Sequence, residues 1–292
     1  METGTIEDQA RDRAIGALVG LAIGDALGTT LEFKDRDTEP PLEDMIGGGP
    51  FGLEPGEWTD DTSMALCLAD SLIAKSGRVD LFDLLERFLA WYRSGTNSSR
   101  GVCFDIGNAT RDALEAFERD ATTRNNAHEA LQANGSIMRL APVVISARNV
   151  EEACSNAARQ SLTTHAAPVP VDCCVELAET LWTQIETGAL YPPIGTLCGR
   201  ARETIVSSGH APATLEAAKW AVANSGDFAE AALLAVNLGG DADTVGAVTG
   251  QIAGSLYGLS GIPETWLRKI FWRDIIQDKA QKLWDLRSVA DA

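Results

Sequence analysis

The sequence predicts an all-α fold in a single compact multi-helix domain, and three observations support this prediction. Apolar residues recur at i, i+3 and i+4 along most of the 292-residue chain. Runs that alternate apolar and polar residues and are rich in β-branched side chains are scarce. No low-complexity linker divides the chain, so we expect one domain over residues 1–292, with residues 1–10 as a loose N-terminal tail.

The helical pattern is clearest in four stretches, which lie at 81–92, 171–185, 215–222 and 275–286. The stretch APVVIS at 141–146 is the best candidate for a strand, although its surroundings have a helical pattern. The longest irregular segment runs from residue 34 to residue 57 and is rich in proline and glycine. A loop of that length in a compact domain is often functional.

Two apolar stretches carry glycine at every fourth position. The positions are Gly16, Gly20, Gly24 and Gly28 in the first, and Gly246, Gly250, Gly254 and Gly258 in the second. Four-residue spacing puts each set on one face of a helix. Glycine costs a helix interior about 1 kcal/mol relative to alanine, so we expect close approach of packed helices as the reason. Tight packing explains the glycines, but it does not explain the acidic residues near each stripe.

The composition argues against several classes of function. The chain has 24 Lys and Arg against 42 Asp and Glu, a net charge of −18, so a nucleic-acid partner is not expected. The N-terminal segment is polar and acidic, unlike a signal peptide. The most apolar stretch, Ala14 to Gly28, contains Asp25 and is too short to span a bilayer, so we expect no membrane span.

The cysteines and histidines narrow the choice of metal. The six cysteines form no C-x-x-C pair, and without a secretion signal we interpret them as reduced thiols of a cytoplasmic protein. The three histidines, His128, His165 and His210, are too few for a conventional zinc site. Any metal is therefore expected to be a hard cation held by oxygen atoms.

Two acidic clusters each open a helix rich in small residues. They are Thr59, Asp60 and Asp61 in WTDDTSM, and Asp241, Asp243 and Thr244 in LGGDADTVGA. Helix capping explains either cluster alone. Together they supply four carboxylates and two hydroxyls, which suit two hard divalent cations. Glu32 is a possible fifth acid of this site. It could equally be an ordinary surface residue, and the sequence favours neither interpretation.

Three further stretches could bind an organic ligand. The NGSIMR stretch has Asn134, Gly135, Ser136, Met138 and Arg139, and it looks like a loop entering a helix with free N–H groups for a phosphate. The FDIGN stretch has Asp105, Gly107 and Asn108 in a similar turn. Without further context, a capping turn explains both stretches. His165, in SLTTHAAP, is by itself more often a polar loop residue than a catalytic one.

Taken together, these stretches resemble the ADP-ribosylglycohydrolase family. The matching pieces are GALVGLAIGDALG at 16–28, EF at 32–33, WTDDTSM at 58–64, NGSIMR at 134–139, THAAP at 164–168 and LGGDADTVGA at 238–247. They cover the chain nearly end to end in the family's order, and the paired acidic motifs are specific. The GVCFDIGNAT stretch at 101–110 looks most like the bacterial branch that removes ADP-ribose from an arginine of dinitrogenase reductase.

The resemblance implies an all-α fold with a dinuclear Mn²⁺ or Mg²⁺ centre at the base of a cleft. It implies that Glu32 lies beside the metals, that the NGSIMR loop and His165 line the ADP-ribose channel, and that Asp105 faces the leaving guanidinium. Asp60, Asp243, Glu32 and Asp105 would carry the catalysis. The metal ligands carried over by motif are Thr59, Asp60, Asp61, Asp241, Asp243 and Thr244. All four aspartates are kept, so we expect an active enzyme.

The expected reaction is hydrolysis of the N-glycosidic bond between ADP-ribose and an arginine side chain, which would reverse mono-ADP-ribosylation. Two alternatives stay open: hydrolysis of another linkage, to serine or in a free ADP-ribose derivative, and binding of ADP-ribose without catalysis. The resemblance also suggests dinitrogenase reductase as the substrate. It further suggests a PII-type signalling protein as a partner that could draw a cytoplasmic enzyme to the membrane.

Overall fold

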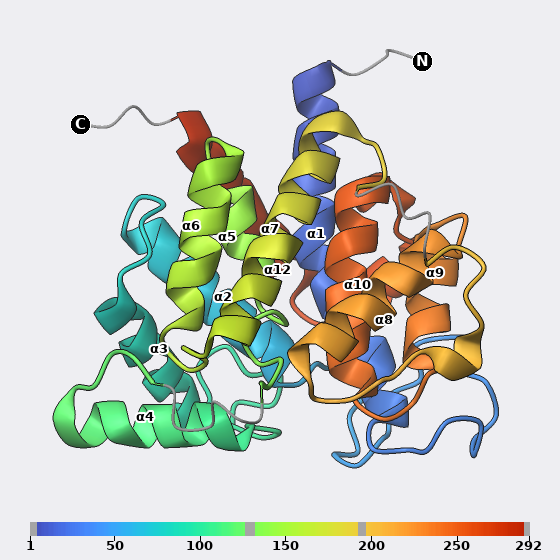
Figure 1. Cartoon of the computed structure of the whole chain (residues 1–292), viewed down its shortest axis with the longest axis horizontal. Helices are drawn as coiled ribbons and strands as arrows, with labels where there is room; N and C mark the ends of the chain where they lie inside the picture. Colours follow the sequence, from blue (N-terminus) through green and yellow to red (C-terminus); the bar gives the residue numbers. More distant parts are fainter. Residues whose placement is uncertain (1–4, 126–131, 192–196, 289–292) are drawn as a thin grey trace.

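Helices form nearly all the regular structure of this protein. The structure is a computed structural model that describes residues 5–125, 132–191 and 197–288, so His128 lies outside the described residues (Figure 1). The α-helices are α1 (Ile6–Gly28), α2 (Asp60–Ala74), α3 (Leu81–Ser94), α4 (Asn108–Asp120), α5 (Ala141–Ile145), α6 (Val150–Ser161), α7 (Pro168–Thr187), α8 (Ala211–Ala223), α9 (Phe228–Val236), α10 (Ala242–Tyr257), α11 (Glu264–Lys269) and α12 (Arg273–Asp285). Short 3₁₀ helices follow at Thr29–Leu31, Arg202–Thr204, Leu259–Gly261 and Leu286–Ser288. Within the described ranges the structure has no strand, which confirms the predicted fold class.

Helix α1 begins earlier than the sequence suggests. Thr5 accepts a hydrogen bond from the backbone N–H of Asp8, and the Asp8 carboxylate accepts one from the backbone N–H of Thr5. This reciprocal capping box satisfies two donors that a helix start leaves open. The expectation of a loose tail over residues 1–10 is therefore corrected from Ile6 onward, because a local cap starts the helix there.

Helix α1 is also longer than its apolar stretch. With the following 3₁₀ turn, Ile6–Leu31 is long and apolar enough to cross a membrane by length and composition. This differs from the expectation for residues 14–28, because the helix begins earlier, at Ile6, and the 3₁₀ turn at Thr29–Leu31 continues it. In the structure 89% of this apolar window is buried inside the protein.

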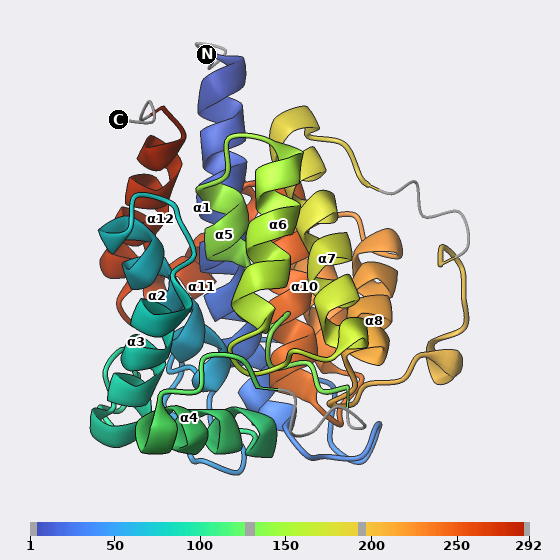
Figure 2. The ribbon, with the colours of Figure 1, turned by 60° about the vertical axis from the view of Figure 1, so that its left-hand side comes forward.

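Helices α1 and α10 pack antiparallel through their glycines, as the stripes predicted. Gly24 lies against Gly246, and Gly16 lies against Gly254. A Cβ atom built on Gly24 would come within 2.0 Å of the Gly246 carbonyl oxygen, so no larger residue fits without moving a helix. Figures 1 and 2 both show the two helices side by side at the centre of the molecule.

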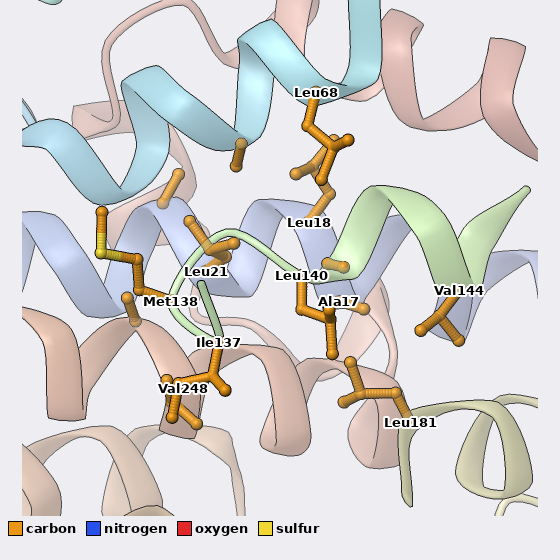
Figure 3. Packing of buried hydrophobic residues seen from close by; sticks show 14 of the residues in the cluster. Ala17, Leu18, Leu21, Leu68, Ile137, Met138, Leu140, Val144, Leu181 and Val248 are labelled. Carbon is orange, nitrogen blue, oxygen red and sulfur yellow. The ribbon is translucent and has the colours of Figure 1, made fainter. Parts of the chain in front are cut away.

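The remaining helices enclose this central pair. Leu18 and Leu21 of α1 pack near Leu68 of α2, Met138 and Leu181, all of them in one buried cluster (Figure 3). The four stretches with the clearest helical pattern lie in α3, α7, α8 and α12, as predicted, except that Leu286 begins the 3₁₀ turn after α12. The core is therefore continuous across α1, α2, α7 and α10.

The best strand candidate, 141–146, is not a strand, because Ala141–Ile145 forms helix α5, in keeping with its helical surroundings. All five of its residues are buried, so the stretch lacks the alternation that separates a helix from a strand. Pro142 lies in the first turn, where a helix tolerates proline.

The irregular segment at 34–57 is fixed to the C-terminal helices. The Asp44 carboxylate accepts hydrogen bonds from Trp266 Nε1 at 2.8 Å and Lys269 Nζ at 2.6 Å. The segment thereby leads the chain from the end of α1 to the start of α2. The antiparallel packing brings the end of α1 beside the start of α10, and these ends lie in the lower part of Figure 1, near α4.

Candidate active site

The start of α2 is held by a buried carboxylate from the last turn of α1. Asp25 Oδ1 accepts hydrogen bonds from the Thr59 backbone N–H and hydroxyl, both at 2.9 Å. Asp25 Oδ2 accepts hydrogen bonds from the Thr62 backbone N–H at 3.0 Å and hydroxyl at 2.6 Å. Asp25 thus caps α2 across space, because the Thr59 side chain does not cap its own helix.

The two acidic clusters meet beside this cap. Thr59 Oγ1 lies 3.3 Å from Asp243 Oδ2 and 3.4 Å from Asp61 Oδ2. Thr244 Oγ1 lies 3.5 Å from Asp61 Oδ2. Residues about 180 positions apart in the sequence therefore share one site, which is the arrangement that the paired motifs predicted.

Glu32 belongs to the same site and is not a surface residue. It is buried, and its Oε2 accepts hydrogen bonds from the backbone N–H groups of Ala242 at 2.7 Å and Asp243 at 3.1 Å. It therefore caps α10 from outside that helix, where a negative charge is favourable. Glu32, Asp241 and Asp243 each offer an oxygen atom within 4.8 Å of the others, close enough to share one metal ion.

Asn134 fixes the orientation of Asp241. Its Nδ2 donates to Asp241 Oδ2 at 2.6 Å and to Thr214 Oγ1 at 2.9 Å. Its backbone N–H donates to the Gly209 carbonyl oxygen. Asn134 thus holds the Asp241 carboxylate in place at the pocket wall.

Asp105 comes from the loop before α4 and has a strained backbone. Its φ of 59° lies in the left-handed region, which is uncommon for a residue with a side chain. The next residues, Ile106, Gly107 and Asn108, lead into the first turn of α4 and also line the pocket. Gly107, the N-cap residue, has no side chain to cap α4, so within the described part of the chain the first N–H groups of α4 lack an N-cap acceptor.

The pKa values of the buried acids lie well above their ordinary values. Burial first and the charge of Asp243 second raise the pKa of Glu32 to about 12. Burial first and Asp60 second raise the pKa of Asp105 to about 11. Burial and Asp243 raise the pKa values of Asp25 and Asp241 to about 7 each. The pKa values of Asp60 and Asp61 also rise well above the ordinary value, first through burial.

The donor set fits divalent cations. Asp61 Oδ1 is buried and has no hydrogen-bond partner among the described residues, which is costly for a carboxylate oxygen. The surrounding ligands are all oxygen atoms from carboxylates and hydroxyls, the set that Mg²⁺ and Mn²⁺ prefer. A cation would satisfy the Asp61 oxygen and offset the repulsion that raises the pKa values.

The acids form one wall of a pocket of about 350 Å³. Met138 and His165 line it together with Asn134, Gly135 and the turn at 106–110. The pocket is also lined by most residues of the acidic clusters and by two further acids, namely Asp60, Asp105, Asp241, Asp243, Thr244 and Glu32. Thr59 and Asp61 are buried and do not line it. The pocket therefore collects most of the residues that the sequence singled out.

Two of the predicted ligand-binding residues do not face the pocket. Ser136 is buried and contacts Ser161 Oγ at 2.9 Å, and Arg139 is fully buried against Gln160, Thr164 and the ring of Phe88. The NGSIMR stretch turns so tightly that Asn134, Gly135 and Met138 line the pocket while Ser136 and Arg139 point into the core. The side chains of Ser136 and Arg139, both expected among the ligand-binding residues, therefore lie outside the pocket lining.

Sequence reasoning missed two residues of the site. Asp25 was treated only as an interruption of an apolar stretch, although a lone acid inside a core helix is itself a signal of a buried polar partner. Phe33 lines the pocket mouth with 67% of its surface exposed and a φ of 61°. The Phe33 ring packs edge to face against the Phe51 ring, with 6.5 Å between the ring centres. Phe51 in turn packs against Phe104, the residue before Asp105.

Comparisons with known proteins agree with this geometry. The family model for ADP-ribosylglycohydrolase matches residues 6–292. The chain is 48% identical to the ADP-ribosylarginine hydrolase Tri1 of Pseudomonas putida over 95% of this chain and 79% of that protein. It is 33% identical to the ADP-ribosyl-[dinitrogen reductase] glycohydrolase of Rhodospirillum rubrum over 89% of this chain and 90% of that one.

A solved structure described as an ADP-ribosylglycohydrolase-related protein complex superimposes with a TM-score of 0.83. The two chains share 39% identity, and the match covers 96% of this chain and 99% of the other. The family model thus matches nearly the whole chain, including both acidic clusters and the helices that carry them. The protein belongs to the ADP-ribosylglycohydrolase family.

Proposed function

We propose that this protein hydrolyses the N-glycosidic bond between ADP-ribose and an arginine side chain of a modified protein. The observation that carries the proposal is the meeting of the two acidic clusters with Glu32 and Asp105 at one pocket. The names of the relatives from Pseudomonas putida and Serratia proteamaculans, both ADP-ribosylarginine hydrolases, support the arginine linkage.

We assign two divalent cations, Mg²⁺ or Mn²⁺, to the oxygen atoms of Thr59, Asp60, Asp61, Asp241, Asp243 and Thr244. When bound, such cations supply Lewis-acid chemistry that activates water near neutral pH and favours the vicinal hydroxyls of a ribose. Asp25, Glu32 and Asn134 hold these ligands in place through the hydrogen bonds described above. The carboxylate-rich wall also favours the positive charge that develops on the sugar as the bond breaks.

Asp105 is placed to handle the leaving group. Its carboxyl group lines the pocket, and burial first and the charge of Asp60 second raise its pKa where no cation offsets that charge. A protonated carboxyl group can donate to the departing guanidine nitrogen, and a carboxylate can hold the guanidinium that results. The exposed ring of Phe33 at the mouth offers an apolar face for the arginine side chain.

The diphosphate of ADP-ribose is assigned to backbone N–H groups. The first turn of α4 and Gly135 of the NGSIMR turn both lie at the pocket, whereas the backbone N–H of Asn134 already donates to the Gly209 carbonyl oxygen. Such groups bind phosphate without basic side chains, which suits a chain with a net charge of −18. His165 adds a side chain to the same wall.

The test is release of ADP-ribose from an ADP-ribosylated arginine peptide, first with added Mn²⁺ or Mg²⁺ and then with a chelator. Release that requires the cation is expected. A serine-linked peptide in a parallel assay measures the alternative linkage, and calorimetry with ADP-ribose measures binding. Binding of ADP-ribose without release from either peptide would sink the proposal and favour a binding protein.

The protein substrate and partners are the finer part of the proposal. The Rhodospirillum rubrum relative is named for dinitrogenase reductase, so the ADP-ribosylated form of that protein is a defined substrate to assay. A PII-type signalling protein is the partner to test, with recruitment of a cytoplasmic enzyme to the membrane as the expected effect. The relatives named for arginine alone share higher identity with this chain, which favours a broader arginine substrate.

A further inference from the structure

The candidate active site borders on a groove in the neighbouring surface. The groove has a volume of about 790 Å³ and follows the segment between α1 and α2. Glu32 and Phe33 line both the groove and the active-site pocket. The two hollows therefore meet at the two residues that follow the 3₁₀ turn Thr29–Leu31.

Phe33 is held in an exposed and strained position at this junction. Its φ of 61° lies in the left-handed region, where a bulky residue is a rare outlier. The Phe33 N–H donates to the Gly240 carbonyl oxygen at 2.8 Å, and the Gly240 N–H donates to the Lys34 carbonyl oxygen at 2.7 Å. These hydrogen bonds hold the backbone while the residue stays 67% exposed. Backbone strain of this kind gathers at ligand-binding sites, so the exposed ring points to a ligand.

The wall of the groove is anchored to the rest of the protein. The Leu42 N–H donates to Asn237 Oδ1 at 2.7 Å, and the Leu42 carbonyl oxygen accepts a hydrogen bond from Asn237 Nδ2 at 3.0 Å. Met45 is fully buried, and the Gly47 carbonyl oxygen accepts a hydrogen bond from the Thr30 hydroxyl at 2.9 Å. A wall fixed in this way loses little conformational freedom when a partner binds, which lowers the cost of association.

Two residues between these anchors line the groove and are exposed. Ile46 is 60% exposed, although it is apolar. Glu43 is exposed and forms no ion pair within the described ranges. The other two acids of residues 39–46 each pair with a lysine, at 3.2 Å for Glu39 and 2.6 Å for Asp44. The groove therefore offers an apolar side chain and one unbalanced negative charge.

The end of the pocket that is assigned to arginine lies on the side of the groove. Asp105, assigned above to the leaving guanidine, directly follows Phe104. The Phe104 ring packs against the Phe51 ring with 5.3 Å between the ring centres, and Phe51 packs against Phe33. A row of contacting rings thus leads from the neighbour of Asp105 to the groove. Because the modified arginine belongs to a protein chain, the residues on either side of it must lie outside the pocket, near this end.

We propose that the groove binds the segment of the modified protein that flanks the ADP-ribosylated arginine. The assignment of this occupant rests on the proposed function. The charge of Glu43 favours a basic residue in the segment, and Ile46 and Phe33 favour an apolar one. The groove thereby distinguishes one modified protein from another, a choice that the pocket cannot make from ADP-ribose, which is the same in all of them.

The test compares modified peptides with ADP-ribosylated free arginine as substrates. Each peptide carries one ADP-ribosylated arginine, and the peptides differ only in a lysine or a glutamate close to it on either side. The wild type is expected to show a kcat/KM about threefold to tenfold higher for a lysine peptide than for the matching glutamate peptide, mainly through KM. The preference should shrink at high salt, because the charges are exposed. Equal kcat/KM values for all peptides would overturn the proposal.

Glu43→Lys reverses the charge of the groove. This variant is expected to lose or invert the preference for the lysine peptide, while its kcat/KM for ADP-ribosylated free arginine stays within about twofold of the wild-type value. Glu86→Lys makes the same change at an exposed position of α3 that lines neither hollow, and it should keep the wild-type preference. Equal effects of the two variants would show that only the net charge matters, which contradicts the proposal.

Ile46→Ser tests the apolar contact in the groove. It is expected to raise the KM of the peptides about threefold to fivefold and to leave the kinetics with ADP-ribosylated free arginine unchanged. Ile6→Ser is the matched control, because Ile6 is 80% exposed at the opposite end of α1 from the groove. Both isoleucines are exposed, so both variants should fold. An unchanged KM for every peptide in Ile46→Ser would contradict the apolar contact.

Binding measurements separate a failure of the groove from a failure of the proposed function. Fluorescence anisotropy gives the Kd of the modified lysine peptide, and calorimetry gives the Kd of ADP-ribose. Tighter binding of the peptide that is lost in Glu43→Lys supports the groove even without release of ADP-ribose, and the missing release then counts against the proposed function alone. Release at equal rates from free arginine and from all peptides supports the function and overturns the groove.

A second copy of this chain is the alternative occupant of the groove. Analytical ultracentrifugation of the wild type and of Ile46→Ser tests this alternative. The proposal predicts the same oligomeric state for both proteins. A wild-type dimer that Ile46→Ser dissociates would assign the groove to a second copy and overturn the proposal.

Discussion

Asp243 interacts electrostatically with the other acids of the site. Its charge contributes to the raised pKa values of Asp25, Glu32, Asp60, Asp61, Asp105 and Asp241. It also contacts the Thr59 hydroxyl of the other acidic cluster. At the scale of single residues, Asp243 is therefore the centre of the site.

Asp243→Asn is expected to abolish metal-dependent activity while the fold survives. Loss of one ligand charge should lower kcat/KM by about 10²-fold or more and weaken metal binding. The protein should still fold, because the substitution keeps the shape of the side chain and relieves repulsion among the neighbouring acids. Activity assays and calorimetric metal titration check this, with the exposed Asp172→Asn as control. Full activity in Asp243→Asn would remove Asp243 from the site.

Asp105→Asn tests the handling of the leaving group. Its carboxyl group is assigned to the departing guanidine, so its loss should lower kcat by about 10²-fold or more. ADP-ribose itself lacks the arginine, so its dissociation constant should change little. Single-turnover kinetics and calorimetry measure the two effects separately. An equal loss in both would instead show that Asp105 helps to bind ADP-ribose.

At the scale of elements, the position of helix α2 depends on Asp25. Asp25→Asn keeps the size of the side chain but replaces one acceptor oxygen by a donor. One of the N–H groups of Thr59 and Thr62 would then face another donor in a buried place. We expect a loss of about 1–3 kcal/mol in the free energy of unfolding and weaker metal binding. Urea unfolding measures this loss, and unchanged stability with unchanged metal affinity would contradict it.

The close packing of α1 and α10 makes a second prediction at this scale. Alanine in place of a helical glycine normally adds about 1 kcal/mol of stability. At Gly20 the added Cβ would lie 2.3 Å from the Gly250 carbonyl oxygen, so the helices must separate. Gly20→Ala should therefore destabilise the protein by about 1–3 kcal/mol or more.

Gly226→Ala is the control for this experiment, because a Cβ there meets its nearest atom at 3.4 Å. Its free energy of unfolding should stay close to the wild-type value. A stable Gly20→Ala protein, measured by the same thermal or urea unfolding, would mean that the two helices do not pack as described.

At the scale of the whole molecule, the buried acids couple stability to pH and to metal. The folded-state pKa values of Asp25 and Asp241 lie near 7, above the ordinary value of 3.8. The folded state therefore binds more protons than the unfolded state between these values, and stability falls as the pH rises through this window. Glu32 and Asp105, with pKa values of about 12 and 11, extend the fall to higher pH.

The prediction is that chelated protein melts at a lower temperature at pH 8 than at pH 5.5. Added Mg²⁺ or Mn²⁺ should stabilise the protein more at pH 8, by about 3 kcal/mol at a hundredfold excess over Kd. Thermal unfolding with and without chelator at both pH values checks this. A gain from the cation that is equal at both pH values would show that these acids do not titrate with folding.

The sequence alone determined the fold class of this protein and the kinds of residues in its site, because both depend on patterns of neighbouring residues. The i, i+3, i+4 periodicity predicted the all-α class, and the glycine spacing predicted two closely packed helices, because both patterns repeat along one helix face. The acids of the two clusters pointed to a common cation site, because four carboxylates in two caps exceed what capping needs. The stretch 141–146 failed as a strand because full burial on all sides removes periodicity.

Only the tertiary structure decided which side chains face the pocket. Asp25 accepts hydrogen bonds from residues 34 and 37 positions away, and Glu32 accepts them from residues 210 and 211 positions away. Ser136 and Arg139 turn into the core while their neighbours line the pocket. A pattern of neighbouring residues fixes the type of local structure, but the partner of a buried polar group is set by the packing of distant elements. The sequence therefore determined the chemistry of the site, and the antiparallel packing of α1 on α10 decided its geometry.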